Sequence, residues 1–171
     1  IIGIYYFNNG ENLMKELKFL IDNNIKDKGE YQLTNALENM KQKGKIFSIG
    51  TVDEWLDCGN KDATVYTSQR VLEHNKNTSM VNENVDLINS EIIEPCYIAD
   101  GITIKNSKIG PHVSIDSGSI IKDSEISNSI IQSNSTIKNA KLKNSMVGNH
   151  TFFDGHKVDQ EISIGDFCEI R

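Results

Sequence analysis

Two short clusters of polar side chains in this sequence could do chemistry. The first runs from Lys28 to Thr34, and the second runs from Trp55 to Asn60. Each cluster places charged groups in a loop directly before an expected helix. Helix N-termini favour phosphate, and open α/β folds gather ligands at such loops. The two clusters are therefore candidate parts of a site that handles phosphate groups.

Asp57 is the central carboxylate of the second cluster, because it lies between an apolar pair and a glycine just before a helix. A carboxylate there suits Mg²⁺, which takes one or two protein oxygens and completes its shell with phosphate and water. An aspartate at this kind of position more often only shapes a turn or caps the helix. Residue type and spacing alone leave both roles open.

The clusters lie in a first part of the chain that alternates between strand and helix. Apolar, β-branched and aromatic runs predict strands, and apolar residues at helical spacing predict amphipathic helices. The expected elements are a strand at 1–7, helices at 11–23 and 32–43, a strand at 45–52 and a helix at 61–74. This order is an α/β pattern. With only two strands, it predicts part of a larger sheet whose other strands lie upstream of Ile1.

The second part of the chain carries three columns of apolar residues. Within a column the step is 16 or 17 residues, and between columns it is five or six. The columns are Ile93, Ile109, Ile126, Leu142 and Val158; Ile98, Ile115, Ile131, Val147 and Ile164; and Ile104, Ile121, Ile137, Phe153 and Ile170. These steps match short strands joined by tight turns, three to a coil, and so predict a parallel β-helix of hexapeptide-type repeats.

The segments between these apolar positions are small, polar and turn-forming, as in Lys105–Ser107 and Ser127–Ser129. The alternative is a β-sandwich of short strands. Sandwich strands would not keep one register over five turns, so the pattern favours the β-helix.

Three stretches resemble successive motifs of the sugar-1-phosphate nucleotidyltransferases: Gly3–Phe7, Gly29–Leu37 and Trp55–Gly59. The group that looks closest is the glucose-1-phosphate thymidylyltransferase type, in its long form with a C-terminal left-handed β-helix. The resemblance implies part of a Rossmann-like α/β nucleotidyltransferase domain at 1–76, a linker and lead-in at 77–91, and a left-handed β-helix at 92–171. The handedness comes from the resemblance alone.

The resemblance also implies a reaction and its residues. Such enzymes join a nucleoside triphosphate to a sugar 1-phosphate and release pyrophosphate, with Mg²⁺ as the usual metal. Asp57 matches the metal-binding aspartate of the W-x-D-x-G motif. Lys28 stands where some members have a basic residue touching the sugar phosphate, and Ile1 and Tyr5 match the strand that lines the sugar pocket. Glu30 either contacts substrate or caps the helix beginning near Gln32.

Several family motifs are absent from this sequence. They are the G-x-G-T-R signature with its P-K pair, the first metal-binding aspartate and the E-K-P motif. The chain thus resembles the C-terminal portion of such an enzyme, and we expect it to be inactive alone. The sequence does not identify the base or the sugar of the substrates. From the resemblance we expect thymidine or uridine with glucose 1-phosphate, and guanosine with mannose 1-phosphate is the near alternative.

Two other functions fit the β-helix. Many left-handed β-helix proteins are acyltransferases that use a histidine base, and His112, His150 and His156 lie in or near expected turns. The coil spacing is constant, so no coil contains a long inserted loop of the kind that commonly encloses an acyl-transfer site. The remaining function is non-catalytic assembly or regulation, and we expect the β-helix mainly to join subunits into a homo-oligomer.

Composition excludes two classes of partner. The net charge of −6 is spread over interspersed acidic and basic residues, so no basic patch for nucleic acid is evident. No apolar run approaches the length needed to span a membrane. Cys58, Cys96 and Cys168 are far apart and form no CxxC pair, which is typical of reduced thiols in a cytoplasmic protein.

Overall fold

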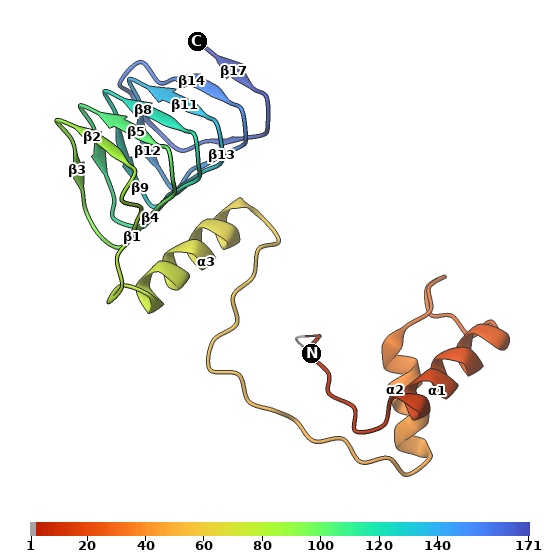
Figure 1. Cartoon of the computed structure of the whole chain (residues 1–171). Coiled ribbons are helices and arrows are strands. Elements are labelled where there is room, and N and C mark those ends of the chain that lie inside the picture. The colour runs from red at the N-terminus through yellow and green to blue at the C-terminus, as the bar shows by residue number, and fades with distance from the viewer. Residues whose placement is uncertain (1–2) are drawn as a thin grey trace. The chain divides into compact units, whose positions relative to one another are not determined.

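The structure is a computed structural model that describes residues 3–171 (Figure 1). The chain divides between Asp53 and Glu54 into two compact units. Within residues 3–171, no helix is both long enough and apolar enough to cross a bilayer.

The first unit is built on two helices, α1 (Gly10–Asp22) and α2 (Leu33–Gln42), which pack against each other. The helix α1 begins where the Asn9 side chain accepts a hydrogen bond from the Glu11 amide at 2.9 Å. Its Leu20 is buried against the partner helix, which buries Ala36 and Met40. Both helices were predicted from the sequence, within one or two residues at each end.

The two strands predicted around these helices are not formed. Residues 3–7 and 45–52 form no strand. Ile46 and Ile49 are 95% and 98% exposed. A strand gains its stability from a hydrogen-bonded neighbour and from burial of one face, and no described segment pairs with either stretch. The expected Rossmann-like sheet is therefore not confirmed.

The second unit is a parallel β-solenoid preceded by helix α3 (Lys61–His74). Successive strands enter three sheets in turn, so each coil contributes one strand to each sheet. The first sheet contains β1 (Met80–Val81), β4 (Cys96–Ile98), β7 (Val113–Ile115), β10 (Ser129–Ile131), β13 (Met146–Val147) and β16 (Ser163–Ile164). The second contains β2 (Asp86–Ile88), β5 (Thr103–Lys105), β8 (Ile120–Lys122), β11 (Thr136–Lys138), β14 (Phe152–Asp154) and β17 (Glu169–Ile170). The third contains β3 (Glu91–Ile92), β6 (Lys108–Ile109), β9 (Glu125–Ser127), β12 (Lys141–Lys143) and β15 (Asp159–Gln160).

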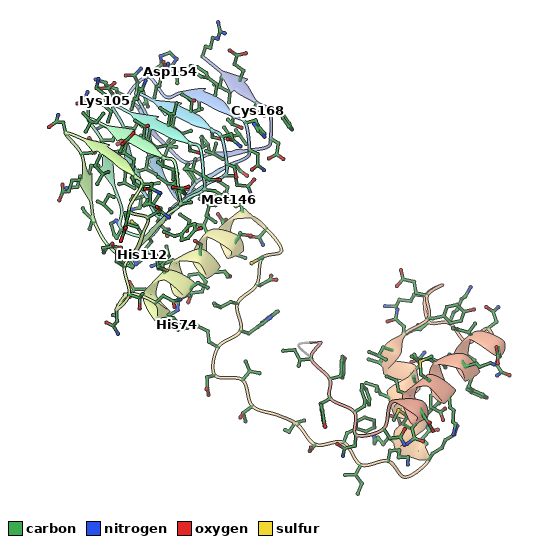
Figure 2. All side chains as sticks on the ribbon, in the orientation of Figure 1. His74, Lys105, His112, Met146, Asp154 and Cys168 are labelled. Atoms are coloured by element: carbon green, nitrogen blue, oxygen red, sulfur yellow. The ribbon has the colours of Figure 1, made fainter. Side chains whose placement is uncertain are left out.

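Strand register confirms two of the predicted apolar columns in full. The column from Ile98 to Ile164 runs through the first sheet, and the column from Ile104 to Ile170 runs through the second. Side chains fill the interior of the coils, while Lys105 points outward (Figure 2). The coils begin at Met80, inside the segment expected to be linker and lead-in.

The third predicted column is wrong at both ends. Ile92, not Ile93, pairs with Ile109, and Gln160, not Val158, pairs with Leu142. The error at the far end arises because the corner after β14 is longer: Gln160 lies seven residues after Phe153, whereas Leu142 lies five after Ile137. Val158 is consequently 57% exposed.

Buried serines join the coils at their corners. The Ser107 hydroxyl accepts a hydrogen bond from the Ser124 amide in the next coil at 3.1 Å, and the Ser124 hydroxyl accepts one from the Ala140 amide at 3.1 Å. The same arrangement links Ser119, Ser135 and Thr151, and also Ser129, Ser145 and Ile162. The predicted turn segments thus lie at the corners, and their serines satisfy buried amides that would otherwise be costly.

Cys96 packs inside one such corner. Its thiol is fully buried beside the Ile93 carbonyl, and burial raises the pKa of Cys96 to about 11. A Cβ at Gly110 would lie 2.0 Å from that carbonyl oxygen, and the φ of +106° there also favours glycine. The Cys96 thiol is therefore structural and unreactive.

Candidate functional site

The candidate site is the loop from Glu54 to Asn60, which leads directly into α3. Asn60 starts the helix, because its side chain accepts a hydrogen bond from the Ala63 amide at 2.9 Å. The Thr64 hydroxyl also donates to the Asn60 carbonyl at 2.8 Å. The end of the loop is thereby fixed to the first turn of the helix.

Side chains further along α3 hold the rest of the loop. The Thr67 hydroxyl donates to the Asp57 carbonyl at 2.6 Å. The Glu54 carboxylate contacts Arg70 Nε at 2.6 Å and His74 Nε2 at 3.2 Å. The hydrogen bond from Arg70 lowers the pKa of Glu54, so the carboxylate stays ionised at neutral pH. The backbone of Asp57, in the loop before α3, is thus anchored to that helix.

The Asp57 carboxylate is free to bind a ligand. The residue is exposed, and only its carbonyl is used in the contacts with α3. A Cβ at Gly59 would lie 3.1 Å from Asp57 Oδ2, so the glycine leaves room around this oxygen. Residues 3–171 contain no group of three or more His, Cys, Asp or Glu side chains placed to hold a metal. One open carboxylate fits Mg²⁺, which keeps several waters and shares substrate phosphates.

We expect Gly59→Ala to weaken metal-dependent activity at this loop. The added methyl group would crowd Asp57 Oδ2 and force it to shift by a few tenths of an ångström, while leaving the fold intact. We expect about a tenfold rise in the Mg²⁺ concentration that gives half-maximal turnover of the full-length protein, as for other changes next to a metal ligand. Gly50→Ala is the control, because a Cβ at that position meets nothing within 4 Å. An equal response in the two variants would contradict the prediction.

Helix α3 lies on the solenoid through one face. Val65 and Leu72 are buried. Lys61 and Ser68 lie on the same helical stripe, at i, i+4, i+7 and i+11 spacing with the two apolar residues. The helix contacts β10, and Ser68 Oγ lies 3.1 Å from Ser114 Oγ of β7. The loop and the solenoid accordingly belong to one compact unit.

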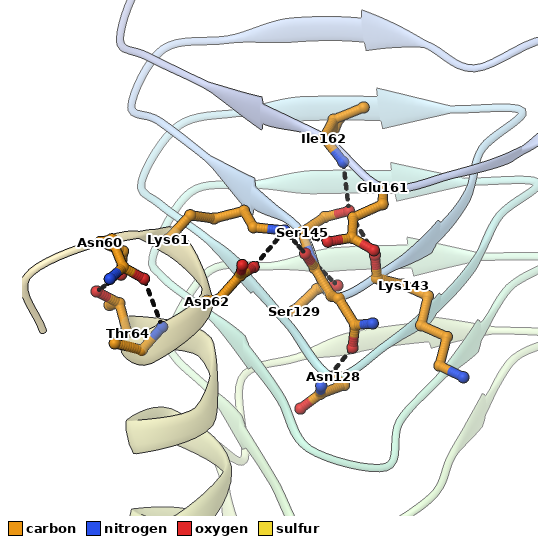
Figure 3. Close-up of polar contacts among 12 residues, drawn as sticks. Asn60, Lys61, Asp62, Thr64, Asn128, Ser129, Lys143, Ser145, Glu161 and Ile162 are labelled. Atoms are coloured by element: carbon orange, nitrogen blue, oxygen red, sulfur yellow. Dashed lines mark hydrogen bonds and ion pairs between the residues drawn. The ribbon is translucent and has the colours of Figure 1, made fainter. Parts of the chain in front are cut away.

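Two charged contacts fix the ends of α3. At its first residue, the Lys61 ammonium contacts the Glu161 carboxylate and donates to the Asn144 carbonyl at 3.1 Å (Figure 3). Near its last turn, Glu73 Oε1 lies 2.6 Å from His112 Nε2. The hydrogen bond with His112 lowers the pKa of Glu73. Hydrogen bonds to Asp62 and then to Glu161 raise the pKa of Lys61.

The other predicted site residues within the described part of the chain belong to the first unit. Tyr5 stacks on Phe7, with ring centroids 6.2 Å apart. Lys28 occupies an exposed tight turn at a φ of +50°. The Glu30 carboxylate accepts a hydrogen bond from the Gln32 side chain at 3.3 Å and does not cap α2. All three belong to the first unit, and Ile1 lies outside the described residues.

The three histidines considered as catalytic bases are all at solenoid corners with positive φ. His112 is engaged by Glu73, and only 16% of its side chain is exposed. The His150 ring stacks on Phe167 at 5.0 Å. His156 is exposed in the long corner after β14.

Sequence reasoning missed Glu54 and Arg70, which hold the loop on α3, and Lys61 and Glu73, which fix the ends of α3 on the solenoid. Their spacing gave a partial signal: Arg70 and His74 are one turn apart on α3. The partners Asn144 and Glu161 come from distant coils, so no local pattern connects them to Lys61.

The chain is similar to bifunctional GlmU proteins. It is 28% identical over 187 residues to GlmU of Latilactobacillus sakei, covering 99% of this chain and 39% of that protein. It is 30% identical over 199 residues to GlmU of Clostridioides difficile, again covering 99% of this chain and 39% of the relative. The chain thus spans about two fifths of the length of these relatives. No protein-family model matches it.

A further relative carries the name glucose-1-phosphate thymidylyltransferase. This protein of Streptomyces griseus is 28% identical over 119 residues, covering 61% of the chain and 34% of the relative. Together, the relatives and the β-solenoid confirm the resemblance to the sugar-1-phosphate nucleotidyltransferases that the sequence motifs indicate.

Proposed function

We propose, from the similarity to GlmU proteins and to a thymidylyltransferase, that this chain is part of a sugar-1-phosphate nucleotidyltransferase. The full-length protein would transfer a nucleotidyl group from a nucleoside triphosphate to a sugar 1-phosphate and release pyrophosphate. The observation that carries the proposal is the open Asp57 carboxylate in a W-x-D-x-G loop held at the N-terminus of α3. The named thymidylyltransferase relative supports a dTDP-glucose type of product, and the motif resemblance adds UDP-glucose as a further product of this type.

Asp57 would hold Mg²⁺ in this reaction. When bound, such a metal neutralises the charge that develops on the transferring phosphate. The protein's own part is positioning. The contacts from Thr67 and Asn60 limit where the Asp57 carboxylate can lie, and correct placement of reacting groups lowers the barrier substantially.

Residues of the first unit would contact the sugar phosphate. Lys28 supplies a point positive charge in an exposed turn, which suits a phosphate oxygen. Tyr5, Ile1 and Glu30 would contribute to the sugar side of the pocket. These roles rest on the motif match, and the nucleotide would be held by parts of the protein outside this chain.

We propose subunit assembly as the role of the solenoid, giving a homo-oligomer in the full-length protein. A solenoid presents backbone edges at its ends, which generally need a cap or a partner. The molar mass of this chain in solution, measured over a hundredfold range of concentration by light scattering, tests the role. A monomer at every concentration would contradict assembly through these coils.

A second candidate is acyl transfer, because many left-handed β-helix proteins are acyltransferases, and the name bifunctional of several relatives leaves room for a second activity. In this chain, His112 is committed to Glu73. This leaves His150 and His156 as the more open bases. Acetyl-coenzyme A turnover by the full-length protein, with and without His150→Ala, tests this activity.

The deciding experiment is pyrophosphate release by the full-length protein. Each common nucleoside triphosphate would be offered with glucose 1-phosphate and with mannose 1-phosphate, with and without Mg²⁺. We expect Mg²⁺-dependent release with one pairing, most strongly dTTP or UTP with glucose 1-phosphate. Absence of release with every pairing would overturn the proposal.

A further inference from the structure

We propose that the solenoid is a positioning part of the nucleotidyltransferase site, acting through the contact between Lys61 and Glu161. The inference rests on the function proposed above. It assigns to Lys61 and Glu161 the task of holding the Asp57 loop in place for metal binding. Neither residue is proposed to touch substrate.

The contact lies directly beside the loop. Lys61 follows Asn60 and is four residues from Asp57. Its ammonium reaches Glu161, between β15 and β16, and the carbonyl of Asn144, between β12 and β13. Figure 3 shows Lys61 and Glu161 meeting where the first turn of α3 approaches the coils. Two successive coils of the solenoid therefore hold the residue that begins the helix.

Local helix chemistry accounts for Lys61 only in part, through the ion pair with its neighbour Asp62 at 2.7 Å. A cation in the first turn opposes the helix dipole, which favours negative side chains there. Asn60 already caps the helix without help from Lys61. The lysine side chain is nonetheless only 21% exposed. Asp62, Glu161 and the Asn144 carbonyl together compensate the charge of Lys61, and the last two attach the residue to the solenoid.

The coupling continues along α3 into the loop. Ser68 and Glu73 hold the middle and the end of the helix on the coils, through Ser114 and His112. The same helix also holds the loop, because Thr67 donates to the Asp57 carbonyl and Arg70 pairs with Glu54. Loss of the Lys61 contact would free the first turn, and with it the Asn60 end of the loop.

Glu161→Gln in the 171-residue chain tests the coupling without any catalytic assay. Gln keeps the size of the side chain and removes its charge. Amide hydrogen exchange at residues 63–66 should become about threefold to tenfold faster, as expected when a charged, partly buried hydrogen bond is lost. Trp55, the single tryptophan of the chain, reports the loop itself, and its fluorescence anisotropy should fall. Exchange in the solenoid strands should not change.

Glu125→Gln is the matched control, since Glu125 pairs with Lys141 at 3.6 Å on the third sheet and makes no polar contact with α3. It should leave residues 63–66 and Trp55 unchanged. Unaltered exchange and anisotropy in Glu161→Gln, or equal changes in both variants, would overturn the coupling.

The full-length protein tests the consequence for the metal. Glu161→Gln should raise the Mg²⁺ concentration for half-maximal turnover about threefold to tenfold and leave turnover at saturating Mg²⁺ nearly unchanged. A purely structural role for Glu161 would lower turnover at saturating Mg²⁺ and leave the Mg²⁺ concentration for half-maximal turnover unchanged, and that result would overturn the positioning role. Failure of the proposed function is separately visible, because the wild-type protein would then release no pyrophosphate. The hydrogen-exchange result does not depend on that activity, so it tests the coupling by itself.

Discussion

Replacing Asp57 with asparagine is expected to lower Mg²⁺-dependent pyrophosphate release by the full-length protein about a hundredfold, which corresponds to about 3 kcal/mol of barrier. Asparagine keeps the shape of the side chain and one oxygen ligand, but it removes the negative charge that attracts a hard cation. The Asp57 carbonyl still accepts from Thr67, so the loop stays anchored. Steady-state rates at several Mg²⁺ concentrations measure the effect.

Asp53→Asn is the control for this substitution. Asp53 is also an exposed aspartate, four residues earlier in the chain and outside the W-x-D-x-G motif. We expect it to leave the rate within about twofold, as is usual for surface changes away from a site. A metal dependence in Asp57→Asn that matched the wild type would show that the aspartate only shapes the turn.

Ile115→Ala is expected to destabilise the solenoid by about 2–5 kcal/mol, the usual range for truncating a fully buried isoleucine. Ile115 has no exposed surface and stacks between Ile98 and Ile131 of the adjacent coils. The coil neighbours cannot collapse into the cavity, because their strands are held in register on both sides. Urea unfolding of this chain, followed by far-ultraviolet circular dichroism, measures the loss.

Val158→Ala provides a comparison that tests the register. The sequence pattern places Val158 inward, but the structure leaves it 57% exposed in the long corner after β14. We expect its truncation to change the unfolding free energy by less than about 0.5 kcal/mol. A loss as large as that of Ile115→Ala would contradict an exposed Val158 and favour the register in which Val158 points inward.

Part of the candidate site could be predicted from the sequence. Asp57 lies in a short motif before a helix, and the cap at Asn60 is a local signal that needs no tertiary structure. The link from Lys61 to Glu161 spans one hundred residues and has no periodic pattern. Such a contact depends on how α3 lies on the coils. The strands expected at 1–7 and 45–52 are not confirmed in residues 3–7 and 45–52 for a related reason, since strand formation needs a partner that no described segment supplies.

The sequence by itself determined the solenoid and the helices. Apolar residues repeat at the length of one coil, and α1, α2 and α3 lie where apolar spacing and capping residues predict them, because both kinds of signal act over a few residues. Only the tertiary structure decided that Gln160 replaces Val158 in the third column and that buried serines join the corners. It alone also placed α3, with the Asp57 loop at its N-terminus, on the solenoid. These features depend on corner lengths and on pairings between distant residues, whose free energies appear only once the coils are stacked.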